Sequence, residues 1–157
     1  MVIATLLLVT ETMVLSQAPS ASARDVKLID RVKSTLVARL DPHLPNLSLE
    51  NWLQVEAGPK AEFPWEVNDC GEQTGTPADG GRTLPRCVEV DAKMRDERSI
   101  VIMVAMTRST KDKTVWPVVY FAQLVTPRET INLRQLSDLP QALIKTHQQP
   151  LFPEIAR

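Results

Sequence analysis

Apolar residues recur at steps of three and four over residues 23–40, a spacing that places side chains on one face of a helix. The apolar positions are Val26, Ile29, Val32, Leu36, Val37 and Leu40. Ser22, with Asp25 three residues later, resembles a capping box, and Pro42 cannot continue the helical hydrogen bonds. The pattern predicts one helix from about residue 23 to residue 40.

Several later segments have the residue pattern of β-strands. Apolar and charged side chains alternate over residues 87–94, which is typical of an antiparallel strand with one buried face. Residues 100–106 are apolar on both faces, as in a central strand, and residues 115–125 contain Pro117, which favours an edge strand or a bulge. Residues 63–68 form a further predicted strand.

Residues 46–56 combine two periodicities. Leu49, Trp52 and Leu53 suit a helical turn, whereas alternating leucine and valine positions in the same segment suit a strand. We predict a short helical turn that leads into a strand near Leu53.

The last predicted element is a helix. Apolar residues have helical spacing over residues 133–144, with Ser137 or Asp138 as the N-cap and Pro140 tolerated in the first turn. Residues 148–157 contain two more prolines and are expected to form an irregular tail.

The order of these elements predicts an α+β fold. Short connections make antiparallel pairing of neighbouring strands the default. We therefore expect an N-terminal helix packed on an antiparallel sheet of about four strands, followed by a C-terminal helix. In outline this order resembles cystatin-like and other helix-on-sheet modules, and the resemblance implies this arrangement and no activity.

Composition and charge restrict the class of protein. The chain has 157 residues, of which 43% are hydrophobic, so it suits one domain with one core and is too apolar for a disordered chain. It carries 18 Lys and Arg against 19 Asp and Glu. This balance provides no basic footprint for nucleic acid, and we expect no nucleic-acid partner.

The first residues have the pattern of an export signal. Residues 2–9 and 13–15 are apolar, and the small residues Ala21, Ser22 and Ala23 follow. We predict a signal peptide over residues 1–23 and one domain over residues 24–157, which places the protein in a secreted or periplasmic compartment. The alternative is an N-terminal helix packed on the domain, favoured by Glu11 and by the lack of a basic residue before the apolar run.

The same apolar run is too short to cross a bilayer as a helix, because that takes about 20 residues. We therefore expect no stable membrane span.

Cys70 and Cys87 are the only cysteines, and sixteen residues lie between them. In an oxidising compartment such a pair is most simply a disulfide. The enclosed residues 71–86 hold four of the five glycines and predict a polar surface loop. A disulfide-closed loop suits recognition, because closure lowers the entropy lost on binding; the alternative is a simple hairpin connection.

Candidate binding residues lie in this loop. Arg82 and Arg86 are expected to make polar contacts with a partner, and Glu72 and Asp79 supply carboxylates beside them. Together with Asp69, these carboxylates could bind a cation. A metal site built from protein oxygen ligands usually needs more closely spaced ligands, so we expect the carboxylates to be solvated.

Motifs that carry catalysis are absent from the sequence. There is no phosphate-binding loop, dinucleotide fingerprint or nucleophile elbow. His43 and His147 have no orienting partner nearby in the chain and are expected to be exposed. We therefore expect no catalytic residues, no cofactor and no metal.

These observations favour an exported, non-enzymatic module that binds another exported or envelope protein, as an inhibitor or as a subunit of an envelope complex. A second hypothesis is a small-ligand carrier or small hydrolase, with a cleft between helix and sheet lined by Trp65, Met103 and Tyr120. A third is a structural accessory domain, which would leave apolar surface bare.

Overall fold

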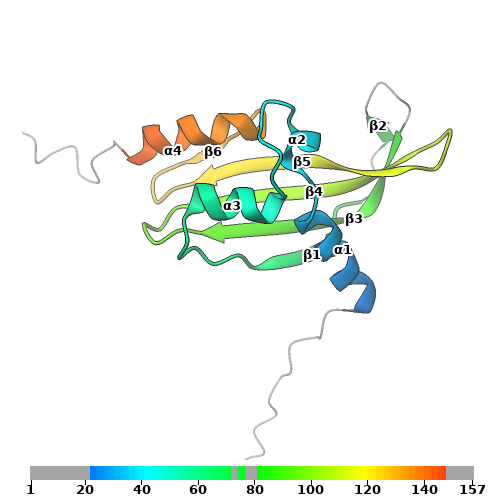
Figure 1. Cartoon of the computed structure of the whole chain (residues 1–157), viewed down its shortest axis with the longest axis horizontal. Coiled ribbons are helices and arrows are strands. Elements are labelled where there is room, and N and C mark those ends of the chain that lie inside the picture. The colour runs from blue at the N-terminus through cyan, green and yellow to red at the C-terminus, as the bar shows by residue number, and fades with distance from the viewer. Residues whose placement is uncertain (1–21, 72–73, 77–80, 148–157) are drawn as a thin grey trace, which may run out of the picture.

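Helices cover one face of an antiparallel sheet (Figure 1). The computed structural model describes residues 22–71, 74–76 and 81–147. The strands are β1 (Trp65–Asp69), β2 (Thr74–Thr76), β3 (Gly81–Lys93), β4 (Ser99–Ser109), β5 (Val115–Val125) and β6 (Thr130–Asn132). The helices are α1 (Ala23–Lys33), α2 (Val37–Leu40), α3 (Leu49–Ala57), the 3-10 helix η1 (Leu136–Asp138) and α4 (Leu139–His147).

The strand order in the sheet is β1–β3–β4–β5–β6, and β2 pairs with β3. Every pairing is antiparallel. The predicted α+β fold, with a helix before the sheet and another after it, is therefore confirmed. Most of the predicted signal peptide (residues 1–21) and the predicted tail from residue 148 lie outside the described residues.

Side chains of the sheet alternate between the face that the helices cover and the opposite face. The buried side chains on the helix-covered face are Val88, Val90, Ala92, Ile100, Ile102, Val104, Met106, Ala122 and Leu124. Leu49, Trp52 and Leu53 of α3 pack against this cluster and are also buried. Glu89 and Asp91 lie on the opposite face, so the alternation predicted for residues 87–94 is confirmed.

The prediction of a single N-terminal helix is wrong, because the chain is not helical between the end of α1 and the start of α2. The hydroxyls of Ser34 and Thr35 both donate to the carbonyl oxygen of Arg31. Such bonds offer the backbone an alternative to the helix. Leu36 then forms an isolated β-bridge with Ser48, a contact with a later segment that local periodicity does not reveal.

A helix replaces the strand predicted near Leu53. The side chain of Ser48 accepts a hydrogen bond from the backbone N–H of Asn51 and caps α3. Leu49, Trp52 and Leu53 are all buried, as expected for positions that share one helical face. The helical periodicity of this segment was therefore the correct one.

The strand predicted from residue 87 begins earlier, at Gly81, so residues 81–86 of the predicted loop belong to β3. They continue the antiparallel ladder with β4, in which Arg82 faces Arg108 and Thr83 faces Thr107. The short strands β2 and β6 were not predicted. Polar sequences of this kind become strands because a neighbouring strand supplies the backbone partners, not because of their own periodicity.

β5 has both features that Pro117 predicts. The register with β4 shifts between Met103 and Val104, which leaves Tyr120 as an extra residue in β5. Beyond its last three residues, β5 is also the edge of the described sheet. The C-terminal helix is confirmed as well, with Pro140 in the first turn of α4.

A buried carboxylate joins α2 to η1. Asp41 directly follows α2, and its side chain accepts hydrogen bonds from the backbone N–H of His43 at 3.0 Å and of Ser137 at 2.8 Å. Burial alone would raise the pKa of Asp41, but the hydrogen bonds from Ser137 and His43 outweigh it and hold the pKa below its usual range. Asp41 is thus a charged anchor between two distant segments.

We predict that Asp41→Asn lowers the free energy of unfolding at neutral pH by about 1–3 kcal/mol, because an amide has one acceptor oxygen for two backbone donors. As the pH falls, the carboxylate of Asp41 is protonated at a higher pH in the unfolded chain than in the folded chain. The contribution of Asp41 is therefore nearly complete above about pH 5 and is lost as the pH falls through the lowered folded pKa. Urea titrations across acid pH measure both effects. Asp30→Asn, at an exposed position of α1, is the control and should change neither.

The start of β3 packs closely against Thr107 of β4 and the indole ring of Trp116 in β5. A Cβ placed on Gly81 would lie 2.6 Å from Cγ2 of Thr107 in β4 and 3.2 Å from Cζ2 of Trp116 in β5. Heavy atoms do not approach this closely without a shift of one partner. Glycine at this position therefore allows three strands to meet beneath Trp116.

We predict that Gly81→Ala lowers the free energy of unfolding by about 1–3 kcal/mol through this overpacking. Thr107→Ser removes Cγ2, so the combination of the two substitutions should cost less than the sum of the single changes. Denaturant titration of the wild type, both single variants and the double variant measures this coupling. Strictly additive losses would show that the Cγ2 contact is not the source of the cost.

Candidate functional site

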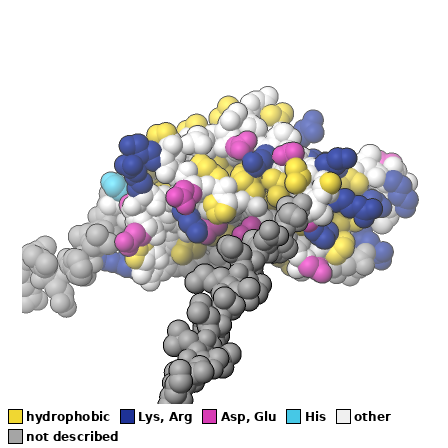
Figure 2. All heavy atoms as spheres, turned by 90° about the horizontal axis from the view of Figure 1, so that it is seen from below, with side chains coloured by type: hydrophobic (Ala, Val, Ile, Leu, Met, Phe, Trp, Pro, Cys, Tyr) yellow, Lys and Arg dark blue, Asp and Glu magenta, His cyan; other side chains and the backbone are white. Residues whose placement is uncertain are grey.

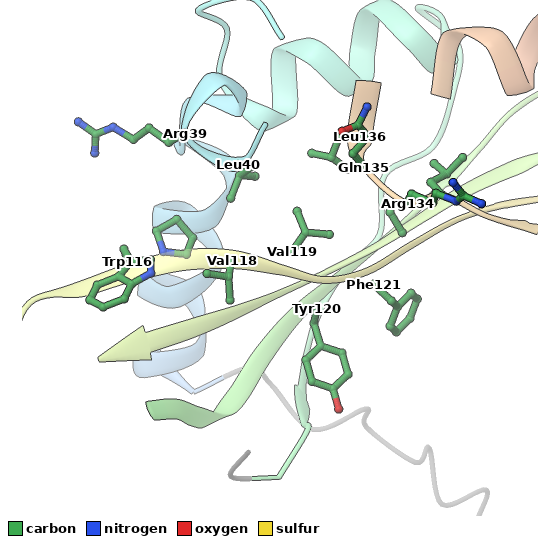
Figure 3. A pocket seen from close by; sticks show the side chains of 13 residues that line it. Arg39, Leu40, Trp116, Val118, Val119, Tyr120, Phe121, Arg134, Gln135 and Leu136 are labelled. Carbon is green, nitrogen blue, oxygen red and sulfur yellow. The ribbon is translucent and has the colours of Figure 1, made fainter. Parts of the chain in front are cut away.

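A groove of about 510 Å³ follows the outer edge of β5 (Figure 3). One wall comes from α2 and the other from the segment between β6 and η1. The lining residues are Arg39, Leu40, Trp116, Pro117, Val118, Val119, Tyr120, Phe121, Ala122, Leu133, Arg134, Gln135 and Leu136. The groove thus combines three segments that lie far apart in the sequence.

The centre of the groove is apolar. Leu40 of α2, Val119 of β5 and Leu136 of η1 point toward one another across it (Figure 3). Tyr120 and Phe121 point to the other side of β5. An extended chain lying in the groove would therefore meet aliphatic side chains from both walls.

The backbone edge of β5 is guarded at its two ends. At one end, the guanidinium of Arg31 in α1 donates to the carbonyl oxygen of Val115 at 2.8 Å. At the other end, the backbone N–H of Leu133 donates to the carbonyl oxygen of Ala122 at 2.9 Å, and β6 pairs with the residues that follow. Between these two hydrogen bonds, no strand of the described ranges pairs with the outer edge of β5.

The direction of the open backbone groups follows from alternation along the strand. The carbonyl of Val115 faces outward, so the polar groups of Pro117 and Val119 face outward too, up to the bulge at Tyr120. Pro117 has no N–H to offer. Val119 therefore provides an outward N–H, and both residues provide outward carbonyls, in the middle of the groove.

The charged side chains that line the groove are both cations. Arg39 and Arg134 line it and are exposed, and no Asp or Glu is among the described lining residues. Throughout the described part of the chain, neither guanidinium has an ion-pair partner. An anionic group entering the groove would therefore meet two available guanidinium groups.

Asp41 holds the two walls in place. Asp41 directly follows Arg39 and Leu40 of one wall in the sequence. It accepts a hydrogen bond from the backbone N–H of Ser137, which directly follows Leu136 of the other wall. The buried carboxylate thus fixes the separation of the two walls as well as the packing of α2.

The predicted disulfide is present and joins Cys70, after β1, to Cys87 in β3. Arg86, predicted to contact a partner, forms an ion pair with Asp25 in the first turn of α1. This pair connects the helix to the sheet beside the disulfide. The structure therefore gives Arg86 an intramolecular partner.

Arg82 lies at the opposite end of the molecule from α4. With Arg108 and Lys113 it lines a depression of about 370 Å³ near the turn between β4 and β5. Figure 2 shows Lys and Arg side chains gathered at this end. Glu72 and Asp79, the other predicted binding residues, lie outside the residues whose side chains are described.

The cleft predicted between helix and sheet does not bring its three residues together. Trp65 lies on the helix-covered face, with the ammonium of Lys33 5.5 Å from its ring centroid. Met103 lies on the opposite face, where Tyr120 also points. Core side chains, Trp52 among them, fill the space between the layers.

The two histidines are exposed, as predicted, and line no common pocket. His147 lines a depression with Arg98 and Arg128, whereas His43 contributes a backbone N–H to Asp41. Sequence reasoning missed the groove residues Arg39 and Arg134. The only sequence signal for this site was Pro117, which correctly indicated an edge or a bulge.

We predict that replacing Cys70 and Cys87 by alanine lowers the free energy of unfolding by about 3 kcal/mol, the expected entropy of closing a loop of this length. The measurement is denaturant titration of the oxidised wild type and the double variant. Thiol titration in denaturant without reductant should find no free sulfhydryl in the purified protein. Two reactive thiols would contradict the disulfide.

The described part of the chain adds no further marker of function. Its helices are too short or too polar to cross a bilayer, and its His, Cys, Asp and Glu residues form no group of three that would hold a metal ion. Comparisons with protein-family models, curated proteins and solved structures find no match to this chain.

Proposed function

We propose that this protein is an exported, non-enzymatic module that binds an extended segment of another protein along the edge of β5. The observation that carries the proposal is a stretch of β5 backbone that no described strand pairs with, inside a groove with apolar walls. An inhibitor or a subunit of an envelope complex would both use such a site. The partner would be another exported or envelope protein.

Strand addition explains how this edge would bind. An extended peptide beside a free edge gains backbone hydrogen bonds, and alternate side chains enter pockets that provide specificity. Native proteins usually guard free edges. Arg31, Pro117 and β6 guard the two ends of the β5 edge, whereas the stretch around Val119 is left open.

The composition of the groove supports binding rather than catalysis. Its described lining contains no carboxylate, imidazole, thiol or aliphatic hydroxyl group. Those groups supply most of the nucleophiles and general bases of enzymes. The chemistry that remains is recognition by aliphatic, aromatic and guanidinium groups.

Two observations support export. The disulfide between Cys70 and Cys87 is of the kind that persists in oxidising compartments. The apolar start of the sequence, followed by small residues near Ala21, fits a secretory signal. Together the two observations support a secreted or periplasmic location.

The segment closed by the disulfide is a competing contact surface, because Arg82 lies beside other cations at that end of the molecule. Gly81 and Arg82 belong to β3, so shortening the segment through Arg82 would cut into the sheet. Substitution of Arg82 is the cleaner way to test this surface.

The test begins with peptides selected for binding to the full chain from a displayed library of random ten-residue sequences. We predict that the affinity of the protein for these peptides falls about tenfold in the variant Val119→Pro, because proline removes the outward N–H. Val119 of β5 and Val104 of β4 face each other with their backbone groups directed away from one another, so proline at position 119 removes no hydrogen bond of this ladder. Val119→Thr keeps the N–H and the side-chain shape and should retain binding.

Thermal unfolding of each variant shows whether the fold is preserved. Selected peptides that bind the proline variant normally and are lost on Arg82→Gln would move the contact surface to the disulfide-closed segment. A library that yields no peptide dependent on Val119 or Arg82 would overturn the proposed function.

A further inference from the structure

We infer that the segment bound along β5 is acidic, with a carboxylate two residues before and two residues after a central apolar side chain. The inference rests on the proposed function and names the chemistry of the partner. It is carried by the arrangement of Arg39 and Arg134 around the apolar centre of the groove.

The two arginines lie toward opposite ends of the groove, and Leu40, Val119 and Leu136 lie between them (Figure 3). Both arginines are exposed, and they come from opposite walls. Because guanidinium groups bind carboxylates through paired hydrogen bonds, each end of the groove suits an Asp or Glu side chain.

The spacing of the carboxylates follows from strand geometry. A strand added to β5 would direct every second side chain toward the helix-covered side, and such side chains are about 7 Å apart. A central apolar side chain would meet Leu40, Val119 and Leu136. The side chains two residues away on the same face would then extend toward Arg39 and Arg134, whose long side chains span the remaining distance.

A second copy of this chain fits the groove less well. Two β5 edges paired about a two-fold axis would place Arg39 of one copy near Arg134 of the other. Two pairs of guanidinium groups, one at each end of the groove, would then face each other with no carboxylate from either described groove lining. Like charges across an interface cost free energy, so the charge pattern favours a partner of opposite charge.

The test uses three synthetic nine-residue peptides on an alternating threonine and valine background. They differ only in the residues two positions before and after the central valine, which are both Glu, both Gln or both Lys. Fluorescence anisotropy with the full chain should give the order Glu, Gln, Lys from tightest to weakest. The preference for Glu over Gln should shrink with added salt, because exposed charges are screened.

Substitution of the arginines assigns the effect to the groove. Arg39→Gln and Arg134→Gln should each weaken binding of the Glu peptide about two- to fivefold and leave the Gln peptide unchanged, as expected for exposed ion pairs. Arg95→Gln, in the exposed turn between β3 and β4, is the matched control and should affect neither peptide. The backbone amide signal of Val119 should shift in NMR spectra when either peptide binds.

The outcomes separate this inference from the proposed function. Equal affinity for the Glu and Lys peptides, with shifts at Val119, would overturn the acidic partner and leave strand addition standing. Binding of none of the peptides, together with a failed library selection, would overturn both. A concentration-dependent dimer that Val119→Pro abolishes would identify a second copy as the occupant and would also overturn the inference.

Discussion

The buried carboxylate of Asp41 is the interaction on which the site depends. It accepts the N–H of Ser137, 96 positions later in the sequence, and so fixes η1 against the end of α2. A buried charge is stable only when hydrogen-bond donors replace the water that it has lost, and here two backbone N–H groups do so. Because the residues just before Asp41 and Ser137 form the two walls, this one side chain joins the walls in addition to the apolar contacts of Leu40 and Leu136 with the core.

The arrangement of the helices explains why the groove lies at β5. Both α1 and α3 contact β3, and α1 also contacts β1, so this side of the sheet is covered by helices. At β5 the helical contacts come from the single turn of α2 and from α4, and the β6–η1 segment forms the second wall of the groove. The groove therefore lies along the part of the β5 edge that α2 and the β6–η1 segment flank.

The elements that could be predicted from the sequence are those whose signals are local. The alternation over residues 87–94 gave the correct buried face of β3, and Pro117 correctly indicated an edge or a bulge. The break after α1 was missed because it depends on the bridge between Leu36 and Ser48, while the apolar spacing continues through it. The groove was missed for the same reason: Arg39 and Arg134 line one groove only after β5, β6 and η1 have been placed.

The guarded ends of β5 also bear on how the protein behaves at high concentration. Cross-β fibrils grow when long, flat stretches of backbone stack without interruption. In β5, the guanidinium of Arg31, the missing amide hydrogen of Pro117 and the short β6 restrict the exposed stretch to a few residues, and the bulge at Tyr120 bends it. So short and bent a stretch lacks the long, flat backbone on which further chains would have to stack for a fibril to grow.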